Sequence, residues 1–537
     1  MNDSLALGQA GRRLRENTGG RAPLLRERPR PAALIALGLL GALFGWLAVL
    51  SGGDLTLLAL LAVIPLAGMI WYRPVFGLYL VLAAGLLLEQ YAIDGLADPV
   101  TGRIPFFSNI GGTEGWNAWT HANLPWLTAN PLEILLVFIA IAMVVRKPKT
   151  QRLRIGRLGA PLLLFLLAVL FAWGFGLLQG GDFKVSLWEI RALFYMGACY
   201  LLAANLIRTP GQVRIVGWIV IGTIGIKALQ GVYRYIVPFH GNLTDIYAIT
   251  GHEDALFFNT LLLLAAALVI YGGPLRVRVA TWLLLPFTLF TMLATRRRAA
   301  LFALLVGGAA LLFTLPARHR ALLPRIFVPL FLVGLIYVGA FYNSTDTIAK
   351  PIQMVKSLYQ PSDPRDVSSN EYRNLEQYDV MMTIRRNPIL GLGFGRPYEM
   401  LVQLPPIPFP LRDYIPHNEI LWIWLKMGTA GFIIFWLFIA SAVVQASLIL
   451  RRLKDPFFQS LAAMILTLVL MQVVVSYADL QMTFYRNMIY LGVMLGVLVR
   501  LDVLDPTLAR LRARAAAAAP AAPSPAAVAA AAPSSAS

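Results

Sequence analysis

The most constraining feature of this chain is a long series of apolar runs separated by short polar connections. A membrane-spanning helix needs about 20 mostly apolar residues, and on that criterion the sequence holds about 14 candidate spans. The composition agrees, because 58% of the 537 residues are hydrophobic and only 14% are charged, far from the balance of a soluble protein. We therefore predict an all-α polytopic integral membrane protein. The candidate spans lie approximately at residues 33–50, 54–71, 75–93, 131–145, 159–178, 191–207, 214–237, 255–272, 280–295, 299–315, 324–342, 418–444, 457–476 and 486–502.

The basic residues predict how these spans are oriented. The N-terminal segment, residues 1–32, is rich in arginine and precedes a long apolar run without a small-residue cleavage pattern, so we expect a retained first helix with a cytoplasmic N-terminus. Every second connection is then basic, as the bias of Lys and Arg toward cytoplasmic loops requires. This bias accounts for the net charge of +19, so the expected partner is a lipid bilayer and not nucleic acid. The basic residues placed inside are Arg73, Arg146, Lys147, Lys149, Arg152, Arg154, Arg157, Arg208, Arg214, Arg276, Arg278, Arg318, Arg320, Arg325, Arg451, Arg452, Lys454, Arg510, Arg512 and Arg514.

The same count of spans divides the chain into five parts. Residues 1–32 form a basic cytoplasmic segment, 33–342 hold spans 1–11, 343–417 form one long outer loop, 418–502 hold spans 12–14, and 503–537 form a cytoplasmic tail. The tail is predicted to be disordered because it is rich in Ala, Pro and Ser and has little to bury.

The long outer loop is predicted to carry a helix. Ser368 and Glu371 have the spacing of a capping box, which predicts a helix start at Ser368. The helix should end near Asn387-Pro388. Apolar residues such as Leu375 and Ile384 alternate with charged ones, a pattern that suits a helix lying on the membrane surface.

Three adjacent cations, Arg296, Arg297 and Arg298, join two spans on the outer side, where few basic residues are expected. Guanidinium groups bind phosphate through two parallel hydrogen bonds and keep their charge at any accessible pH. The triplet therefore indicates an anionic ligand at the outer leaflet. The alternative is that the count has slipped by one helix and the triplet is an ordinary inside loop.

Other cations lie at or near the same face, and ionisable residues within spans often mark a site. Arg191 follows Glu189 by two residues, so an ion pair between them or a lipid headgroup contact is the alternative to a site. Lys227 and Arg234 are as well explained by snorkelling to the interface. Arg373 in the long loop and Arg486 at the start of the last span complete this set.

His417 stands where the outer loop returns to the membrane. An imidazole takes up a proton near neutral pH, as the activation of a hydroxyl requires, although a structural role is the alternative. Asp413, Glu419 and Tyr485 are further candidates for hydrogen bonding there. Cys199 is the only cysteine, and we find no zinc, calcium or P-loop spacing, so no metal or nucleotide cofactor is expected.

Three motifs together resemble a known family. They are Thr295-Arg296-Arg297-Arg298-Ala299-Ala300-Leu301, then Arg373 followed by Asn387-Pro388-Ile389-Leu390-Gly391-Leu392-Gly393-Phe394-Gly395, then His417-Asn418-Glu419-Ile420-Leu421-Trp422. Their order and spacing resemble the O-antigen ligase and polymerase family of bacterial envelope proteins, specifically through about 251–435. The chain departs from the family in having about two more candidate helices and no clear match for an upstream arginine, for which Arg191 is our candidate.

The resemblance implies a GT-C-like, metal-independent glycosyltransferase of the bacterial inner membrane with its site on the periplasmic face, so that the loop 343–417 is periplasmic. Family members pass a glycan from undecaprenyl diphosphate to an acceptor. By resemblance, Arg297 and Arg298, with Arg296 also a candidate, bind the diphosphate together with Arg373 and Arg191. His417 then orients or deprotonates the acceptor hydroxyl, and attack opposite the leaving group inverts the anomeric centre. The turn from Gly391 to Gly395 either lets backbone approach the substrate or is a plain loop.

Three alternatives remain open at this point. A saccharide ligase, a polysaccharide polymerase and a protein O-oligosaccharyltransferase share the chemistry and differ in acceptor. We favour a ligase or polymerase because the outer loop is modest and no large soluble domain offers a peptide-binding surface. A transporter of lipid-linked glycan would show Gly/Pro-broken helices in paired halves, and we find no such symmetry.

Overall fold

The computed structural model describes residues 46, 55–91, 104–111, 127–147, 152–242, 249–315, 322–344, 364–407 and 409–518, together with 349, 352, 353, 356, 357 and 360. Contacts divide the chain into two units, residues 1–69 and residues 70–537. The helices from α4 onward belong to the second unit. Within the described residues the secondary structure is helical throughout, as predicted. The helices are α3 (Leu55–Tyr72), α4 (Val75–Leu87), α7 (Pro131–Arg146), α8 (Gly159–Leu178), α9 (Phe183–Leu206), α10 (Pro210–Ile236), α11 (Asp254–Ile270), α12 (Leu275–Ala294), α13 (Arg298–Phe313), α15 (Leu322–Phe341), α17 (Pro364–Arg386), α18 (Glu419–Arg452), α19 (Pro456–Ala478), α20 (Tyr485–Leu504) and α21 (Pro506–Ala518).

Seven of the described helical segments are long and apolar enough to cross a membrane. They are α8, α9, α10, α12, α18, α19 and the segment Tyr485–Arg512, which holds α20. Shorter apolar helices, including α4, α11 and α13, add to these. The chain is therefore a multi-pass membrane protein, while the count of about 14 spans stays a prediction. The first predicted span, 33–50, lies almost entirely outside the described residues, as do residues 1–32 and residues 519–537 of the tail. The described part of the tail holds α21, so the prediction that 503–537 is disordered is wrong for residues 506–518.

Helix caps explain where sequence-based boundaries differ from the structure. Helix α9 begins at Phe183, eight residues before the predicted 191, because the side chain of Asp182 accepts a hydrogen bond from the Val185 N–H at 2.9 Å. The first turns of α9 contain Lys184 and Glu189, which lower its hydropathy and hide its start. Helix α10 likewise begins at Pro210, where Thr209 and Gln212 form a capping box.

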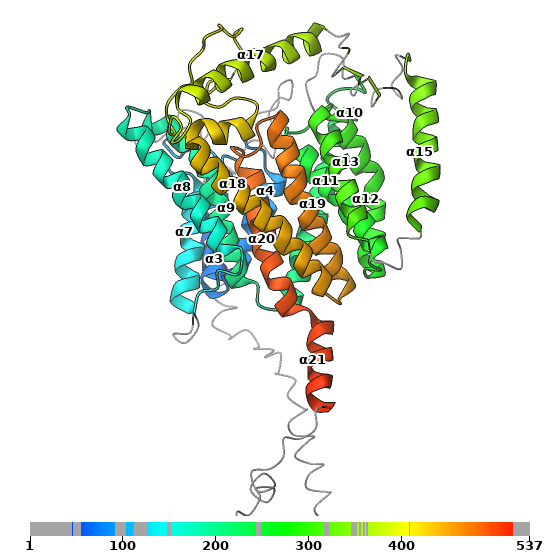
Figure 1. The fold of residues 1–537 in the computed structure, drawn as a ribbon. Coiled ribbons are helices and arrows are strands. Elements are labelled where there is room, and N and C mark those ends of the chain that lie inside the picture. The colour runs from blue at the N-terminus through cyan, green and yellow to red at the C-terminus, as the bar shows by residue number, and fades with distance from the viewer. Residues whose placement is uncertain are drawn as a thin grey trace, which may run out of the picture. The chain divides into compact units, whose positions relative to one another are not determined.

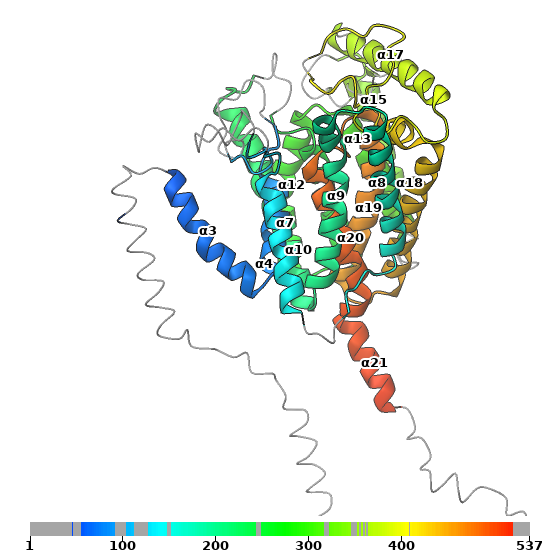
Figure 2. The same cartoon turned by 90° about the vertical axis from the view of Figure 1, so that its left-hand side faces the viewer.

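Helices α9 and α20 pack closely at the centre of the bundle (Figures 1 and 2). Two glycines four residues apart on α20 permit this approach, the arrangement that brings membrane helices together. A Cβ added at Gly492 would lie 2.3 Å from the carbonyl oxygen of Met196, and one at Gly496 would lie 2.5 Å from that of Tyr200. Any larger residue would push the two backbones apart.

Helix α17 lies across one end of the bundle in both views of the fold (Figures 1 and 2). It ends at Arg386 as predicted, but it begins at Pro364, so the start predicted at Ser368 is wrong. Proline is favoured at the first helical position because its missing N–H has no intrahelical partner there. Val380 and Ile384 pack against Leu425 of α18, so these apolar residues face protein rather than lipid, unlike the predicted surface helix.

Helix α18 is broken at Gly428, whose φ of 62° and ψ of −175° are not helical. The segment after α17 fills the break: the N–H of Leu392 donates to the Leu425 carbonyl at 2.8 Å and the N–H of Gly393 to that of Lys426 at 3.0 Å. On the other side, a Cβ at Gly393 would lie 2.3 Å from the Cα of Gly176 in α8. The glycine turn is therefore close to protein backbone on both sides, which explains its composition without a substrate.

A buried carboxylate fastens this turn to the bundle. The N–H of Gly395 donates to Glu189 of α9 at 2.5 Å, and Nζ of Lys426 lies 2.8 Å from the same carboxylate. Trp422 donates to it through Nε1 at 3.2 Å. Glu189 thus pairs with Lys426, and the alternative of an ion pair between Glu189 and Arg191 is replaced by this contact.

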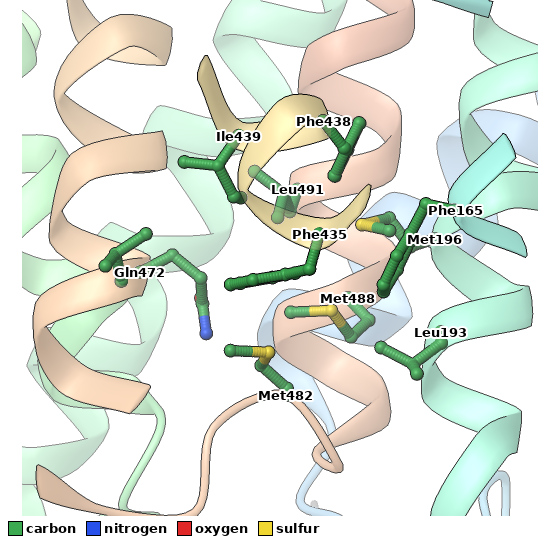
Figure 3. Close-up of a pocket in the computed structure, with 11 residues that line it drawn as sticks. Phe165, Leu193, Met196, Phe435, Phe438, Ile439, Gln472, Met482, Met488 and Leu491 are labelled. Carbon is green, nitrogen blue, oxygen red and sulfur yellow. The ribbon is translucent and has the colours of Figure 1, made fainter. Parts of the chain in front are cut away.

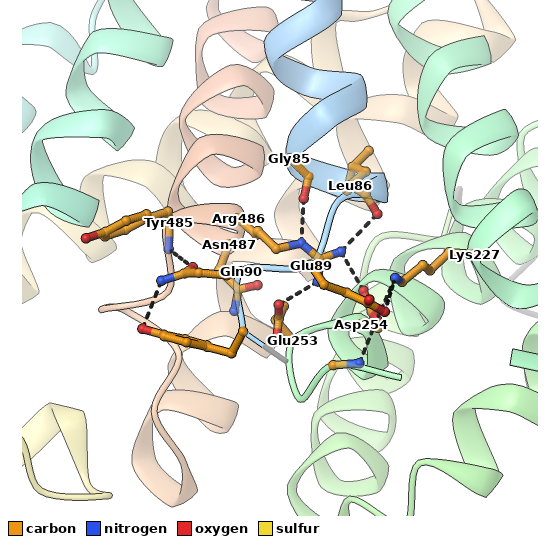
Figure 4. Close-up of polar contacts among 12 residues, drawn as sticks. Gly85, Leu86, Glu89, Gln90, Lys227, Glu253, Asp254, Tyr485, Arg486 and Asn487 are labelled. Carbon is orange, nitrogen blue, oxygen red and sulfur yellow. Dashed lines mark hydrogen bonds and ion pairs between the residues drawn. The ribbon is translucent and has the colours of Figure 1, made fainter. Parts of the chain in front are cut away.

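A second buried network joins α4, α10, α11 and α20 (Figure 4). Lys227 lies 2.7 Å from Glu89, and Arg234 lies 2.6 Å from the same carboxylate. Arg486 contacts Glu253 at 2.5 Å and Asp254 at 2.6 Å. Lys227 and Arg234 are therefore paired inside the bundle instead of snorkelling to the interface. Three cations and three carboxylates balance, which lowers the cost of burying them.

Candidate active site

The arginine triplet occupies the tight connection between α12 and α13. Arg296 has a φ of 53°, in the left-handed region that few non-glycine residues adopt. Arg297 is the cap residue of α13, and Arg298 is its first residue. This turn directs the side chains of Arg297 and Arg298 apart, so these two arginines contact different partners.

Arg298 contacts the loop of residues 343–417. Its Nη1 donates to the hydroxyl of Ser357 at 3.2 Å, and its Nη2 donates to Oδ1 of Asn370 on α17 at 3.1 Å. Arg298 therefore links α13 to α17, and this contact explains its presence without a ligand. Its assignment to diphosphate binding stays a prediction.

Arg297 points to Asp479, which directly follows α19. Its Nη1 lies 3.6 Å from Oδ2 of Asp479, and its side chain is 22% exposed. Asp479 was not among the sequence-predicted residues. Its position in the short outer connection 477–485 was the available signal, because that connection lies on the predicted face of the site.

His417 is held by Glu376 of α17. Both carboxylate oxygens lie 3.1 Å from Nδ1, and Oε2 also accepts from the His417 backbone N–H at 2.9 Å. Tyr372 packs edge-on against the ring at 5.5 Å. A carboxylate accepts hydrogen bonds, so this contact favours a proton on Nδ1 and leaves Nε2 to accept one from a substrate. Glu376 was also missed, although it lies one helical turn after Arg373.

The two residues after His417 hold the site in place. The side chain of Asn418 caps α18 by accepting from the Leu421 N–H at 3.1 Å. Glu419 accepts from the backbone N–H groups of Gln481, Met482 and Thr483, with 2.5 Å to Gln481 and 3.0 Å to Thr483. The proposed hydrogen-bonding role of Glu419 is thus structural, because it fixes the connection that carries Asp479.

The charges of this region converge on Asp479. Burial raises the pKa of the Asp479 carboxyl, but the positive charges of its neighbours lower that pKa by more. The net result is a pKa below the ordinary value. These neighbours are His252, Arg297, Arg373 and His417. The charges of three predicted residues, Arg297, Arg373 and His417, therefore act on the carboxyl of Asp479. Of the neighbours in direct contact with it, Arg297 was predicted and His252 was not. We call these five residues the cluster around Asp479.

Arg191 has other partners. Its guanidinium donates to Oδ1 of Asn109 at 2.8 Å and to the carbonyl of Thr128 at 2.6 Å, and its Nε lies 3.0 Å from Glu133. It is 6% exposed. Arg191 thus fastens the connection before α7 to α9, and none of these contacts is with the cluster around Asp479. The other hydrogen-bonding candidates have neighbours of their own, since Asp413 lies 3.2 Å from Arg412 and Tyr485 stacks on Trp188.

An apolar pocket lies within the bundle beside the connection that carries Asp479 (Figure 3). Its cavity volume is about 20 Å³, which is room for little more than one water molecule. Met482 lines it from that connection, while Phe165, Phe435 and Phe438 line it from α8 and α18. Gln472 contributes an amide. Such a lining accepts hydrocarbon and offers few partners for a polar group.

Two guanidinium groups beside two imidazoles suit an anionic substrate whose reaction moves a proton. The arginines supply fixed positive charge, and His417 supplies a proton acceptor whose other nitrogen is already engaged. No group of three or more His, Cys, Asp or Glu side chains suited to a metal ion occurs in the part of the chain that the structure describes.

Residues 279–436 match the family model described as O-Antigen ligase. They contain Arg297, Arg373 and His417 of the cluster, whereas His252 and Asp479 lie outside them. A segment of 173 residues is 28% identical to the O-antigen ligase of Salmonella typhimurium strain LT2. This alignment covers 31% of the chain and 40% of the length of that curated relative. Through the matched residues, the chain is similar to the O-antigen ligase family, and it spans about 40% of the length of the curated relative.

Proposed function

We propose that this protein is a glycosyltransferase that moves a glycan from undecaprenyl diphosphate to a saccharide acceptor at the periplasmic face of the bacterial inner membrane. The observation that carries this proposal is the convergence of Arg297, Arg373 and His417 around Asp479 at one end of a bundle of apolar helices. The family match supports the same reaction class.

The reaction proceeds by a single displacement. The acceptor hydroxyl oxygen forms a bond to the anomeric carbon while the bond from that carbon to the diphosphate oxygen breaks. The hydroxyl proton passes to Nε2 of His417, and undecaprenyl diphosphate leaves with the electron pair. Attack opposite the leaving group inverts the anomeric centre.

The arginines stabilise the charge that develops on the leaving diphosphate. Fixed cations aimed at developing charge need no reorganisation during the reaction, which makes them effective in a site with little water. Arg373 and Arg297 supply this charge in the proposal, so that the transfer proceeds without a divalent cation. Asp479 keeps Arg297 in place at 3.6 Å.

The hydrocarbon part of the donor needs an apolar surface near the cluster. The side chains of Phe165, Phe435, Phe438 and Met482 are apolar and lie beside the connection that carries Asp479, but the cavity of about 20 Å³ between them is too small for an isoprenoid unit (Figure 3). As acceptor we favour the saccharide of a lipopolysaccharide core, because the relative from Salmonella typhimurium is an O-antigen ligase.

A transfer assay with the purified full-length protein in lipid tests this function. Donor is undecaprenyl-diphosphate-linked glycan, and acceptors are a core lipopolysaccharide, the donor itself and a peptide. We expect transfer to the core, unaffected by EDTA. R373A and H417A should lower kcat by about 10²-fold or more, since positioned acid–base groups contribute that much. R385A is the matched control, because Arg385 is an exposed arginine of the same helix. Wild-type protein that transfers nothing, or H417A that transfers normally, would refute the proposal.

The orientation of the site is tested separately. An alkaline phosphatase reporter fused within the connection after Thr295 should be active, since that enzyme folds only outside the cytoplasm, and a fusion after Tyr271 should be inactive. The opposite pattern would put the arginine triplet on the cytoplasmic side and remove the electrostatic argument.

A further inference from the structure

A histidine outside the family-matched region stands beside the proposed site. His252 belongs to the turn of residues 249–254 that leads into α11, whereas the match covers residues 279–436. The side chain of His252 is 45% exposed. Its neighbours are not: Ile249 and Asp254 are 0% exposed, Thr250 is 1% exposed and Glu253 is 3% exposed. Among the side chains of residues 249–254, only the imidazole of His252 is therefore exposed.

The buried charge network holds this turn from both ends, and Figure 4 shows the end at Arg486. On one side Arg234 donates to the carbonyl of Ile249 at 3.1 Å. On the other side Arg486 contacts Glu253 at 2.5 Å and Asp254 at 2.6 Å. The carboxylate of Asp254 also accepts from the Gly251 N–H at 2.9 Å. Two buried arginines and the carboxylates of Glu253 and Asp254 thus fix a short turn whose exposed side chain is a histidine.

The imidazole of His252 faces the cluster around Asp479. Its Nδ1 lies 3.8 Å from Oδ2 of Asp479, the oxygen that Arg297 approaches at 3.6 Å. Its ring packs edge-on against Phe484 at 6.4 Å. Nδ1 is the nitrogen on the Asp479 side, so Nε2 is the ring nitrogen left for a ligand.

The surroundings keep this imidazole neutral. The protein around part of the ring lowers the pKa of His252 below its ordinary value, and the charge of Arg297 lowers it as well despite the opposing effect of Asp479. A neutral imidazole donates one hydrogen bond and accepts another, which suits a hydroxyl group better than a phosphate. His252 therefore differs chemically from the arginines beside it.

We propose that His252 is a substrate-binding residue of this site, whose Nε2 hydrogen-bonds a sugar hydroxyl beside the anomeric carbon. The proposal rests on the proposed function, since it names the sugar contact of the same site. The hydroxyl belongs either to the transferred glycan or to the acceptor. His252 lies outside the region matched by the family model, so we expect it to recognise the particular saccharide that this chain uses.

Steady-state kinetics of the full-length protein in lipid test this assignment. The concentrations of donor glycan and of acceptor are varied in separate series for wild type, H252L and H252Q. We expect H252L to raise the KM of one saccharide substrate about tenfold, the cost of one good hydrogen bond, with kcat changed less than about threefold. The substrate whose KM rises identifies the source of the hydroxyl. H252Q keeps a donor and an acceptor, so it should recover most of the lost affinity.

H240N is the matched control, because His240 is an exposed histidine of the same outer connection and asparagine tolerates its φ of 48°. A fluorescence melting curve in detergent confirms that each variant is folded. H252L with wild-type KM values for both substrates overturns the inference, and so does H252L that lowers only kcat, or H252Q that recovers no affinity. A wild-type protein that transfers no glycan refutes the proposed function and, with it, this inference. Normal transfer by the wild type with unchanged KM values in H252L refutes only the inference.

Discussion

Three adjacent residues, His417, Asn418 and Glu419, perform three different tasks. His417 faces the charged cluster, Asn418 caps α18, and Glu419 binds the backbone of residues 481–483. Substitutions at these positions should therefore fail in different ways. Loss of the imidazole affects the reaction, whereas loss of Asn418 or Glu419 affects the position of α18 or of Asp479.

Glu376 should be a positioning residue for His417. E376A removes the carboxylate that holds Nδ1, so we expect kcat to fall about 10²-fold, the effect of misplacing a reacting group by about 1 Å. E376Q retains one acceptor and should lose less, and KM should change little in both. E371A is the control, since Glu371 is exposed on the same helix. A wild-type kcat in E376A would contradict this role.

Glu89 should stabilise the fold in a pH-dependent way. Burial raises its pKa, but hydrogen bonds and charges from Arg234 and Lys227 lower it more, from 4.5 to about 2. A lowered pKa stabilises the folded state fully above pH 4.5, and this stabilisation is lost as pH falls toward 2. The shift corresponds to a free energy on the order of 3 kcal/mol.

Thermal unfolding in detergent tests this point. E89Q should unfold at a clearly lower temperature than wild type at pH 7, and the gap should shrink as pH falls below 4.5. E371Q should behave as wild type at both pH values. A gap that stays constant down to pH 3 would show that ionisation of Glu89 does not stabilise the fold.

The site could be predicted from sequence only where chemistry and position coincide within one motif. His417 and Arg373 stand in motifs on the predicted outer face, and the charges of both act on Asp479. Glu376 could have been found from its helical spacing to Arg373. For Asp479 the only signal was its position in the connection 477–485. His252 gave no signal, because its proximity to Asp479 depends on how α11 and α19 pack, which no local pattern specifies.

Among the elements, helix ranges were predictable where hydropathy alone decides them. Helix α8 has the predicted range 159–178. Helix α9 does not match, because its first turns carry charged residues that are satisfied by distant partners, such as Lys426 for Glu189. Hydropathy counts such residues as polar, whereas in the fold they are buried and paired.

The break in α18 gives a prediction at the scale of the element. Gly428 combines a φ of 62° with a ψ of −175°, and a Cβ there would lie 2.1 Å from the Ile389 carbonyl oxygen. G428A should therefore lower stability by about 2 kcal/mol or more, since this backbone region is essentially restricted to glycine. G174A in α8 is the control, because a Cβ there meets nothing within 4 Å. It should stabilise by about 0.5 kcal/mol through helix propensity. Equal melting temperatures for the two variants would contradict this account of the break.

For the whole molecule, the contact between α9 and α20 is the critical packing. G492L and G496L should each prevent a stable bundle, because the larger side chain meets backbone atoms of α9 that lack room to move. G222L is the control, since a Cβ at Gly222 of α10 meets nothing within 4 Å. Size-exclusion profiles in detergent should show aggregation for the first two variants and a single peak for the control. Single peaks for all three would show that the helices tolerate a wider separation.

The attachment of α17 has a consequence for how substrates arrive. Arg298 secures this helix near Asn370, and Val380 and Ile384 secure it near its other end. A helix held at two points cannot open as a lid, so we expect lipid-linked glycans to enter laterally from the surrounding bilayer while α17 keeps its position. Slow deuterium uptake by the backbone amides of α17 throughout turnover would agree with lateral entry. A burst of uptake in each cycle would show instead that α17 moves.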